Sequence, residues 1–379
     1  MLFDYVTLKL IWWGLIGVLL IGFAIMDGHD MGVGALLPLL GKDDVDRRVM
    51  INSIAPHWDG NQVWFITAGG AVFAAWPFVY ATAFSGLYWA LLLVLFALFF
   101  RPVGFEYRSK IADTRWRKFW DLGIFLGSII PALVFGVAFG NLFLGVPFEL
   151  DDTMRSFYLG SFWELLNPFA LLVGLVSLSL LVIQGATFLA HRTEGILQAR
   201  AKHIVNILLI IFVLSFSLAG IWVHHMDGYV IQKIGNLNDA LSPLMKEAAR
   251  QPGGWLTNYI TMPVLWVVPT LAYLASLLTF ICVRYNRTLL SFICSSLICV
   301  SVILTAGIAL FPFILPSSVM PRASLTVWDA VSSHFTLSVM LWVALIFTPI
   351  VLVYTSWAYR VMRGKVTREY VETHTKLLY

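Results

Sequence analysis

Long runs without a charged residue alternate with short hydrophilic connectors along the whole chain. A stretch of about 17 to 25 apolar residues is long enough to cross the hydrocarbon core of a bilayer as an α-helix. The pattern therefore predicts nine transmembrane helices. They fall at about residues 10–26, 51–75, 78–100, 122–145, 165–190, 204–223, 261–283, 289–313 and 335–359.

The second and third predicted helices come from a single uncharged run of 41 residues, Gly60 to Phe100. One continuous helix of that length would measure about 60 Å, roughly twice the hydrocarbon thickness. The chain must therefore turn back inside the run. Trp76-Pro77 favours the turn, because proline disrupts a helix and restricts the residue before it. The second helix then begins before Gly60 and carries His57 and Asp59 in its first turns.

The positive charges indicate how the helices are oriented, because cytoplasmic loops of membrane proteins collect Lys and Arg. With an external N-terminus and nine crossings, 19 of the 25 Lys and Arg fall in cytoplasmic segments. We therefore predict an all-α polytopic protein in one integral membrane domain, 1–379, with its N-terminus outside and its C-terminus in the cytoplasm.

Composition narrows the class of protein. The chain is 59% hydrophobic and 12% charged, whereas a soluble protein has about 25% charged residues. The net charge of +4 does not indicate nucleic-acid binding, because the cations are spread over many connectors. The three cysteines, Cys282, Cys294 and Cys299, lie in apolar stretches without the clustering of a metal site. We predict no metal site and no cleaved signal peptide.

The first polar segment follows the first predicted helix. Asp27 and Asp30 are three residues apart and would share one helical face. The glycines that follow would allow another helix or a cofactor-sized group to approach closely. Two interpretations stay open, a proton-conducting carboxylate pair and a polar helix end at the lipid headgroups.

The second polar segment places His, Asp, Asn and Gln within six positions at the start of the uncharged run. A carboxylate well inside a bilayer costs on the order of 3 kcal/mol, so such a residue usually faces a bundle interior or a water path. Asp59 is the strongest single candidate for proton chemistry. His57, Trp58 and Asn61 are candidates for a relay or a structural role, which we favour over haem ligation by His57.

The third polar segment lies at the inner end of the third predicted helix. Arg101 and Glu106 are five residues apart across a proline and a glycine, so helical spacing does not assure a direct pair. Arg101 is instead a candidate to neutralise Asp27, Asp30 or Asp59, which the predicted topology places on the same cytoplasmic side.

Several signatures of other protein classes are missing. The chain contains no nucleotide-binding glycine-rich loop and no hydrolase or zinc-protease motif. Of the eight histidines, only His57 falls within a predicted helix. A membrane haem protein needs several deep axial ligands, so this chain is poorly equipped to hold haems alone.

Segments spread over essentially the whole chain carry a specific resemblance. They are Gly28 to Gly34, Ile51 to Trp64, Phe99 to Lys110, Gly136 to Asn141, Gln184 to Thr187, Thr305 to Gly307, Phe311 to Phe313 and Ser324 to Ser333. In this order they closely resemble subunit II of cytochrome bd-type quinol oxidases. The resemblance implies nine transmembrane helices, built as two four-helix bundles plus one peripheral helix.

The resemblance also implies a respiratory function. It implies a heterodimer with a haem-bearing subunit I in the bacterial cytoplasmic (inner) membrane. The complex would oxidise ubiquinol or menaquinol and reduce O2 to water, with protons drawn from the cytoplasm to generate a proton motive force. Two haems b and haem d would be held mainly by subunit I, as would the quinol-oxidising loop. A structural quinone in this chain and small accessory subunits are compatible with the resemblance.

Single residues can be carried over from the family. Asp59 matches a carboxylate proposed to line a proton path, with Asp30 and Arg101 as polar companions. Glu106 stands where relatives carry Asp, which keeps the carboxyl group and lengthens its reach by one methylene. Asp27 joins this predicted path as the second acid of its helical face, and no residue is predicted to be catalytic or to bind a metal.

Two other classes of function remain as alternatives. A secondary transporter could use proline-broken helices and a buried carboxylate as a substrate or ion site, and it would function without a partner. A purely structural scaffold subunit would use the Asp residues only to hold helices together.

Overall fold

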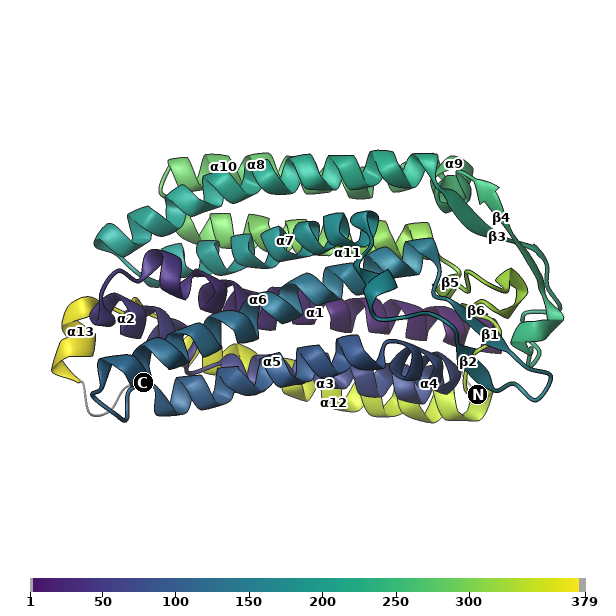
Figure 1. The fold of residues 1–379 in the computed structure, drawn as a ribbon, viewed down its shortest axis with the longest axis horizontal. Helices are drawn as coiled ribbons and strands as arrows, with labels where there is room; N and C mark the ends of the chain where they lie inside the picture. The colour runs from purple at the N-terminus through teal and green to yellow at the C-terminus, as the bar shows by residue number, and fades with distance from the viewer. Residues whose placement is uncertain (1–2, 375–379) are drawn as a thin grey trace.

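The computed structural model describes residues 3–374; the predicted domain 1–379 extends beyond them at both ends. Most of the described chain is helical, and the long helices run along one common axis (Figure 1). The helices are α1 Tyr5–Leu40, α2 Asp44–Ile54, α3 Trp58–Ala75, α4 Pro77–Gly86, α5 Tyr88–Tyr107, α6 Thr114–Leu144, α7 Pro168–Arg192, α8 Gly195–His225, α9 Thr257–Thr261, α10 Val267–Arg284, α11 Thr288–Leu310, α12 His334–Val361 and α13 Arg368–Thr373.

Within these residues, eight helices are long and apolar enough to cross a membrane, and the bent pair α3–α4 makes a ninth if it counts as one span. The prediction of a mostly helical protein with several membrane-spanning helices is therefore confirmed, although short strands occur in the connectors. The predicted turn at Trp76-Pro77 is also confirmed, since α3 and α4 meet there at 119°. Pro77 is the first residue of α4, a position where the missing N–H costs nothing.

The first three predicted spans differ most from the helix bounds, and α6 and α8 also begin earlier than predicted. The first helix continues past residue 26 to Leu40, because its acids find partners inside the protein and do not end the helix. The second predicted span is divided into α2 and α3 by a short turn around Pro56. The third is divided at Leu87, after which α5 continues to Tyr107.

Short two-stranded antiparallel sheets lie at one end of the helices (Figure 1). The strands are β1 Phe148–Leu150, β2 Ser156–Tyr158, β3 Asp227–Lys233, β4 Glu247–Pro252, β5 Phe313–Leu315 and β6 Leu325–Thr326. The β1–β2, β3–β4 and β5–β6 pairs lie opposite the end that carries α2 and α13. The long polar connector at 224–260 is therefore largely occupied by the β3–β4 hairpin.

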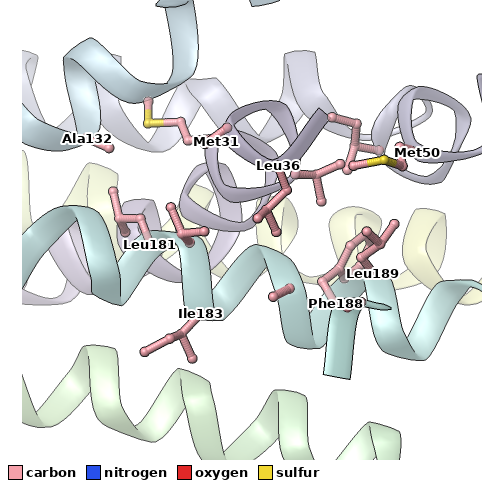
Figure 2. Packing of buried hydrophobic residues seen from close by; sticks show 14 of the residues in the cluster. Met31, Leu36, Met50, Ala132, Leu181, Ile183, Phe188 and Leu189 are labelled. Carbon is pink, nitrogen blue, oxygen red and sulfur yellow. The ribbon is translucent and has the colours of Figure 1, made fainter. Parts of the chain in front are cut away.

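The core lies where α1 and α7 meet. α1 packs against α3, α6 and α7, and α5 packs against α6. α7 also contacts α8 and α11, α10 packs against α11, and α12 packs against α1 and α3. Met31 and Leu36 of α1 belong to the same buried cluster as Leu181 of α7 (Figure 2).

Two glycines set the approach of α1 to α7. A Cβ atom added to Gly32 would lie 2.3 Å from the carbonyl oxygen of Leu181, and one added to Gly185 would lie 2.4 Å from the carbonyl carbon of Gly32. These are backbone atoms, so no side-chain rotation would relieve the clash. The close approach predicted from the glycines is therefore made by a helix.

A network of ion pairs ties α2 to its neighbours at one end of the molecule. Asp121 of α6 accepts hydrogen bonds from Arg47 and from the buried Arg108, at 2.6 and 2.5 Å. Arg108 also donates to Asp44 at 2.9 Å, and Arg117 of α6 donates to Asp44 at 2.8 Å. Arg108 is therefore a structural residue that joins α2, α5 and α6.

The same network holds the C-terminal helix α13. Arg368 is about half exposed and donates to Asp46 at 2.6 Å and to Asp43 at 3.0 Å. Arg200 of α8 donates to the other oxygen of Asp46 at 2.8 Å. The backbone N–H of Val366 donates to the Arg192 carbonyl, so this segment folds back across the ends of α2 and α7.

Arg368→Gln is expected to release α13 at a cost below about 1 kcal/mol, because partly exposed ion pairs contribute little. Limited proteolysis should cleave the C-terminal segment faster while the helices stay intact. The control is Arg363→Gln, at an exposed position five residues earlier. Equal cleavage rates in the two variants would contradict the role of Arg368.

The opposite end contains a buried ion pair between two connectors. Lys246 donates to Asp329 at 3.0 Å, and each side chain is 1% exposed. Burial lowers the pKa of the Lys246 ammonium, and the neighbouring Asp329 carboxylate opposes that shift. The pair fastens the connector that precedes β4 to the loop that precedes α12.

Candidate functional site: a buried polar cluster around α1

The acids predicted in the first helix meet an arginine from α5. Nη2 of Arg101 donates to Oδ1 of Asp27 at 2.6 Å, and Nη1 donates to Oδ2 at 3.1 Å. The two side chains are 0% and 1% exposed. The predicted neutralisation of an acid by Arg101 is therefore confirmed, with Asp27 as its partner.

Asp30, one helical turn further along α1, is held from α3 and α12. Nδ2 of Asn61 donates to Oδ2 of Asp30 at 2.8 Å, and the Tyr359 hydroxyl donates to Oδ1 of Asn61 at 2.8 Å. The Tyr359 ring stacks on His57, with ring centroids 4.0 Å apart and planes 8° from parallel. The end of α12 therefore contributes a side chain to the cluster and contacts two of its residues.

His29 lies between the two acids and is fully buried. Its Nδ1 is 2.9 Å from the carbonyl oxygen of Ile25, and its Nε2 is 3.3 Å from Oδ1 of Asp30. The rings of Phe188 and Phe292 enclose the imidazole, with centroids 4.1 and 5.9 Å away. The prediction that His29 lies beyond the first helix is wrong, because α1 continues through it to Leu40.

A second polar group adjoins the cluster from α7 and α11. Nε2 of Gln184 donates to the Ser296 hydroxyl at 2.8 Å and approaches the Ile25 carbonyl at 3.4 Å. The Ser295 hydroxyl donates to Oε1 of Gln184 at 2.6 Å and shares a hydrogen bond with Thr187. Hydrogen-bonding side chains thus continue from α1 into the α7–α11 contact.

The structure does not bring every predicted site residue into this cluster. Asp59 is exposed in the first turn of α3, and Glu106 is exposed near the end of α5. Trp58 is buried and packs against the ring of Phe105, with centroids 5.4 Å apart. His57 reaches the cluster through the stacking of its ring on Tyr359.

Sequence reasoning missed His29 and Tyr359. The helical spacing of Asp27 and Asp30 could have indicated that the helix continues past both acids. His29 lies between them in the sequence, so it would then be either buried in the protein or exposed to lipid. No local signal indicates Tyr359, which is 298 residues from Asn61.

The cluster has the groups for proton chemistry. A carboxyl and an imidazole in contact can hold or pass a proton, and the neighbouring carboxamide and phenol can orient them through hydrogen bonds. Among residues 3–374 no group of three His, Cys, Asp or Glu side chains is placed to hold a metal ion. Two cavities lie at the end that carries the sheets, and neither is lined by a histidine, cysteine or methionine that could ligate a haem iron.

The fold and the cluster define a class of protein: a polytopic helical membrane protein in which charged side chains are buried with ion-pair or hydrogen-bond partners where the helices meet. The sequence model of the family described as cytochrome bd terminal oxidase subunit II matches residues 8–362. The chain belongs to this family, and it is a multi-pass protein of the bacterial inner membrane.

Similar proteins span almost the full length of the chain. It is 55% identical over 377 residues to cytochrome bd-I ubiquinol oxidase subunit 2 of Escherichia coli (strain K12), covering 99% of this chain and 100% of that one. It is 33% identical to cytochrome bd ubiquinol oxidase subunit 2 of Bacillus subtilis (strain 168), covering 95% and 97%. A chain in the structure of bd oxidase from Geobacillus thermodenitrificans shares the fold, with a TM-score of 0.69, 15% identity and coverage of 94% and 98%.

Proposed function

We propose that the chain is subunit II of a quinol:oxygen oxidoreductase complex, in which it stabilises a haem-bearing subunit I and delivers protons from the cytoplasm. Ubiquinol or menaquinol would be oxidised and O2 reduced to water, which generates a proton motive force. One observation carries the proton role: Asp27, Asp30 and His29 are fully buried, yet each makes an ion pair or a hydrogen bond with a polar group of the cluster.

Burying such groups is expensive in a membrane, which supports a functional role. Ionisable residues inside membrane segments are rare and mark ion or proton pathways. A structural role alone would be met by apolar residues of similar volume, because replacing a buried ion pair by apolar residues is often neutral or stabilising. The cluster is therefore better explained by proton transfer than by packing.

The helix contacts support the finer architecture implied by the family. α1, α3, α5 and α6 would form one four-helix bundle, α7, α8, α10 and α11 the second, and α12 the peripheral helix. We propose that the end with α2 and α13 faces the cytoplasm, since most Lys and Arg lie in connectors assigned to that side. Protons would then approach Asp30 from the end where α3 begins.

The haems and the partner follow from the same proposal. Two haems b and haem d would be bound mainly by subunit I and would supply the electron transfer and oxygen chemistry. This chain would contribute the proton path and a packing surface. A structural quinone in this chain and small accessory subunits stay predictions.

Asp59→Asn tests the proton role. We propose that the exposed Asp59 carboxylate collects protons for the buried cluster, so the variant should slow oxygen consumption about tenfold, which is about 1.4 kcal/mol in the barrier. The haem absorption spectrum should be unchanged. Asp152→Asn, at an exposed loop position, is the matched control and should keep full turnover.

Two outcomes would contradict this role. Unchanged turnover in a fully assembled Asp59→Asn complex would remove Asp59 from the proton path. A smaller amount of complex with normal turnover per haem would favour the scaffold alternative. The transporter alternative predicts that a tag on this chain purifies no haem protein, whereas the proposed function predicts haem b and d bands with a second large membrane subunit.

A further inference from the structure

We propose that His29 and Asp30 share one proton between imidazole Nε2 and carboxyl Oδ1, and so form a proton-holding pair. The inference rests on the proposed function, because it places a storage point within the proposed path. It depends on three observations that concern different atoms: the hydrogen bond that fixes the imidazole, the ion pair that occupies Arg101, and the contacts that occupy the other carboxyl oxygen.

The first observation fixes where the imidazole carries its proton. Nδ1 of His29 is 2.9 Å from the carbonyl oxygen of Ile25. A carbonyl oxygen only accepts, so Nδ1 must donate and carry a hydrogen. In a neutral ring Nε2 then has a lone pair and no hydrogen. It faces Oδ1 of Asp30 at 3.3 Å.

An ionised Asp30 beside this neutral ring would place two acceptors in contact. Both side chains have no exposed surface, and neither Nε2 nor Oδ1 has another hydrogen-bond partner. Two buried acceptors in contact repel each other, and each loses the hydrogen bond that water would give it. A proton between the two atoms turns this contact into a hydrogen bond, whichever atom holds it.

The second observation is the balance of charge. Arg101 gives two hydrogen bonds to Asp27, so its charge is directed at that carboxylate. The contacts described for Asp30 provide a carboxamide and an imidazole but no second arginine or lysine. One cation between two ionised acids would leave a net negative charge buried, which is costly. One proton on the His29–Asp30 pair neutralises this net negative charge.

The third observation orients the Asp30 carboxyl group. Asn61 donates to Oδ2 of Asp30, and Tyr359 donates to the carbonyl oxygen of Asn61. Oδ2 accepts this bond, so the amide nitrogen of Asn61, which only donates, faces Asp30, and the amide oxygen is left to accept from Tyr359. Oδ1 is therefore the oxygen left to face His29, and Tyr359 is a positioning residue.

The charged and titratable groups that face the pair come from five segments. Asp27 lies on α1, Arg101 on α5, His57 before α3, Arg192 on α7 and Tyr359 on α12. Loading the pair breaks one bond from a donor to hydrogen and forms one N–H or O–H bond on the pair; unloading reverses this. No electron moves in either step.

Infrared spectroscopy of the purified whole complex tests the pair. With isotope-labelled aspartate or histidine, the wild-type protein should show a carboxylic-acid or an imidazolium band that both Asp30→Asn and His29→Gln remove or shift. The controls Asp152→Asn and His203→Gln change exposed residues and should leave the band unchanged. If no carboxylic-acid or imidazolium band responds to both substitutions, the shared proton is ruled out.

A milder variant keeps the test decisive if either substitution prevents assembly. Tyr359→Phe removes only a hydroxyl from the last turn of α12, and Tyr354→Phe is the control, an exposed tyrosine on the same helix. Tyr359→Phe should shift the frequency of the labelled band, and Tyr354→Phe should not. An unshifted band in Tyr359→Phe would overturn the proposed orientation of the carboxyl group.

The spectrum and the turnover separate this inference from the proposed function. A band that responds to both substitutions, together with normal oxygen consumption in Asp30→Asn, would support the pair and exclude Asp30 from the proton path. Slow oxygen consumption without such a band would support the path and overturn the pair.

Discussion

Arg101→Met is expected to destabilise the protein by about 3–5 kcal/mol, the cost of leaving one partner of a buried ion pair alone. The variant removes both hydrogen bonds to Asp27 at a site with almost no exposed surface. Asp27 would have to take up a proton or draw water into the helix contact. The amount of assembled complex in membranes and its thermal unfolding temperature measure the effect.

The double variant Arg101→Met with Asp27→Leu separates the ion pair from the rest of the site. It replaces both charges by apolar groups, so it should recover much of the stability that the single variant loses. Arg284→Met, at an exposed position of α10, is the control for removing an arginine. A single variant as stable as this control would contradict the structural importance of the pair.

Gly32→Ala is expected to prevent normal packing of α1 against α7. Its Cβ atom would lie 2.3 Å from the Leu181 carbonyl oxygen and 2.7 Å from Cα of Gly185, so the helices must move apart. Overpacking of a well-filled core costs about 1–3 kcal/mol. The higher end is expected here, because the clash involves backbone atoms. The yield of assembled complex and its unfolding temperature should both fall.

Gly17→Ala is the matched control on the same helix. No atom lies within 4 Å of the Cβ position at Gly17, so the same added methyl group should leave assembly unchanged and can raise the helix propensity slightly. Equal assembly of the two variants would show that the backbone contact between α1 and α7 does not limit packing.

Much of the helical framework could be predicted from local patterns. A run of 41 uncharged residues is too long for one crossing, and Trp76-Pro77 provides a turn, so the bend between α3 and α4 was predictable. The end of α1 was not. Asp27 and Asp30 suggested a helix end, and only their partners on other helices explain why the helix continues to Leu40.

The candidate site was predicted in part. The pairing of Arg101 with an acid was predicted from charge, since a buried arginine needs a counter-ion. The choice of Asp27, the bond between Asn61 and Asp30, and the hydroxyl of Tyr359 depend on contacts between α1, α3, α5 and α12. Helix periodicity does not specify such contacts, because they join residues far apart in the chain.

The sequence by itself determined that this protein is a polytopic membrane protein, where its chain turns, and which few charges lie near the membrane interior. These properties follow from the hydrophobicity of each stretch, which acts locally. Only the tertiary structure decided which charges are buried together. Asp27, His29 and Asp30 lie in one buried cluster, whereas Asp59 and Glu106 are exposed. The reason is that the packing of separate helices determines which face of each helix is buried.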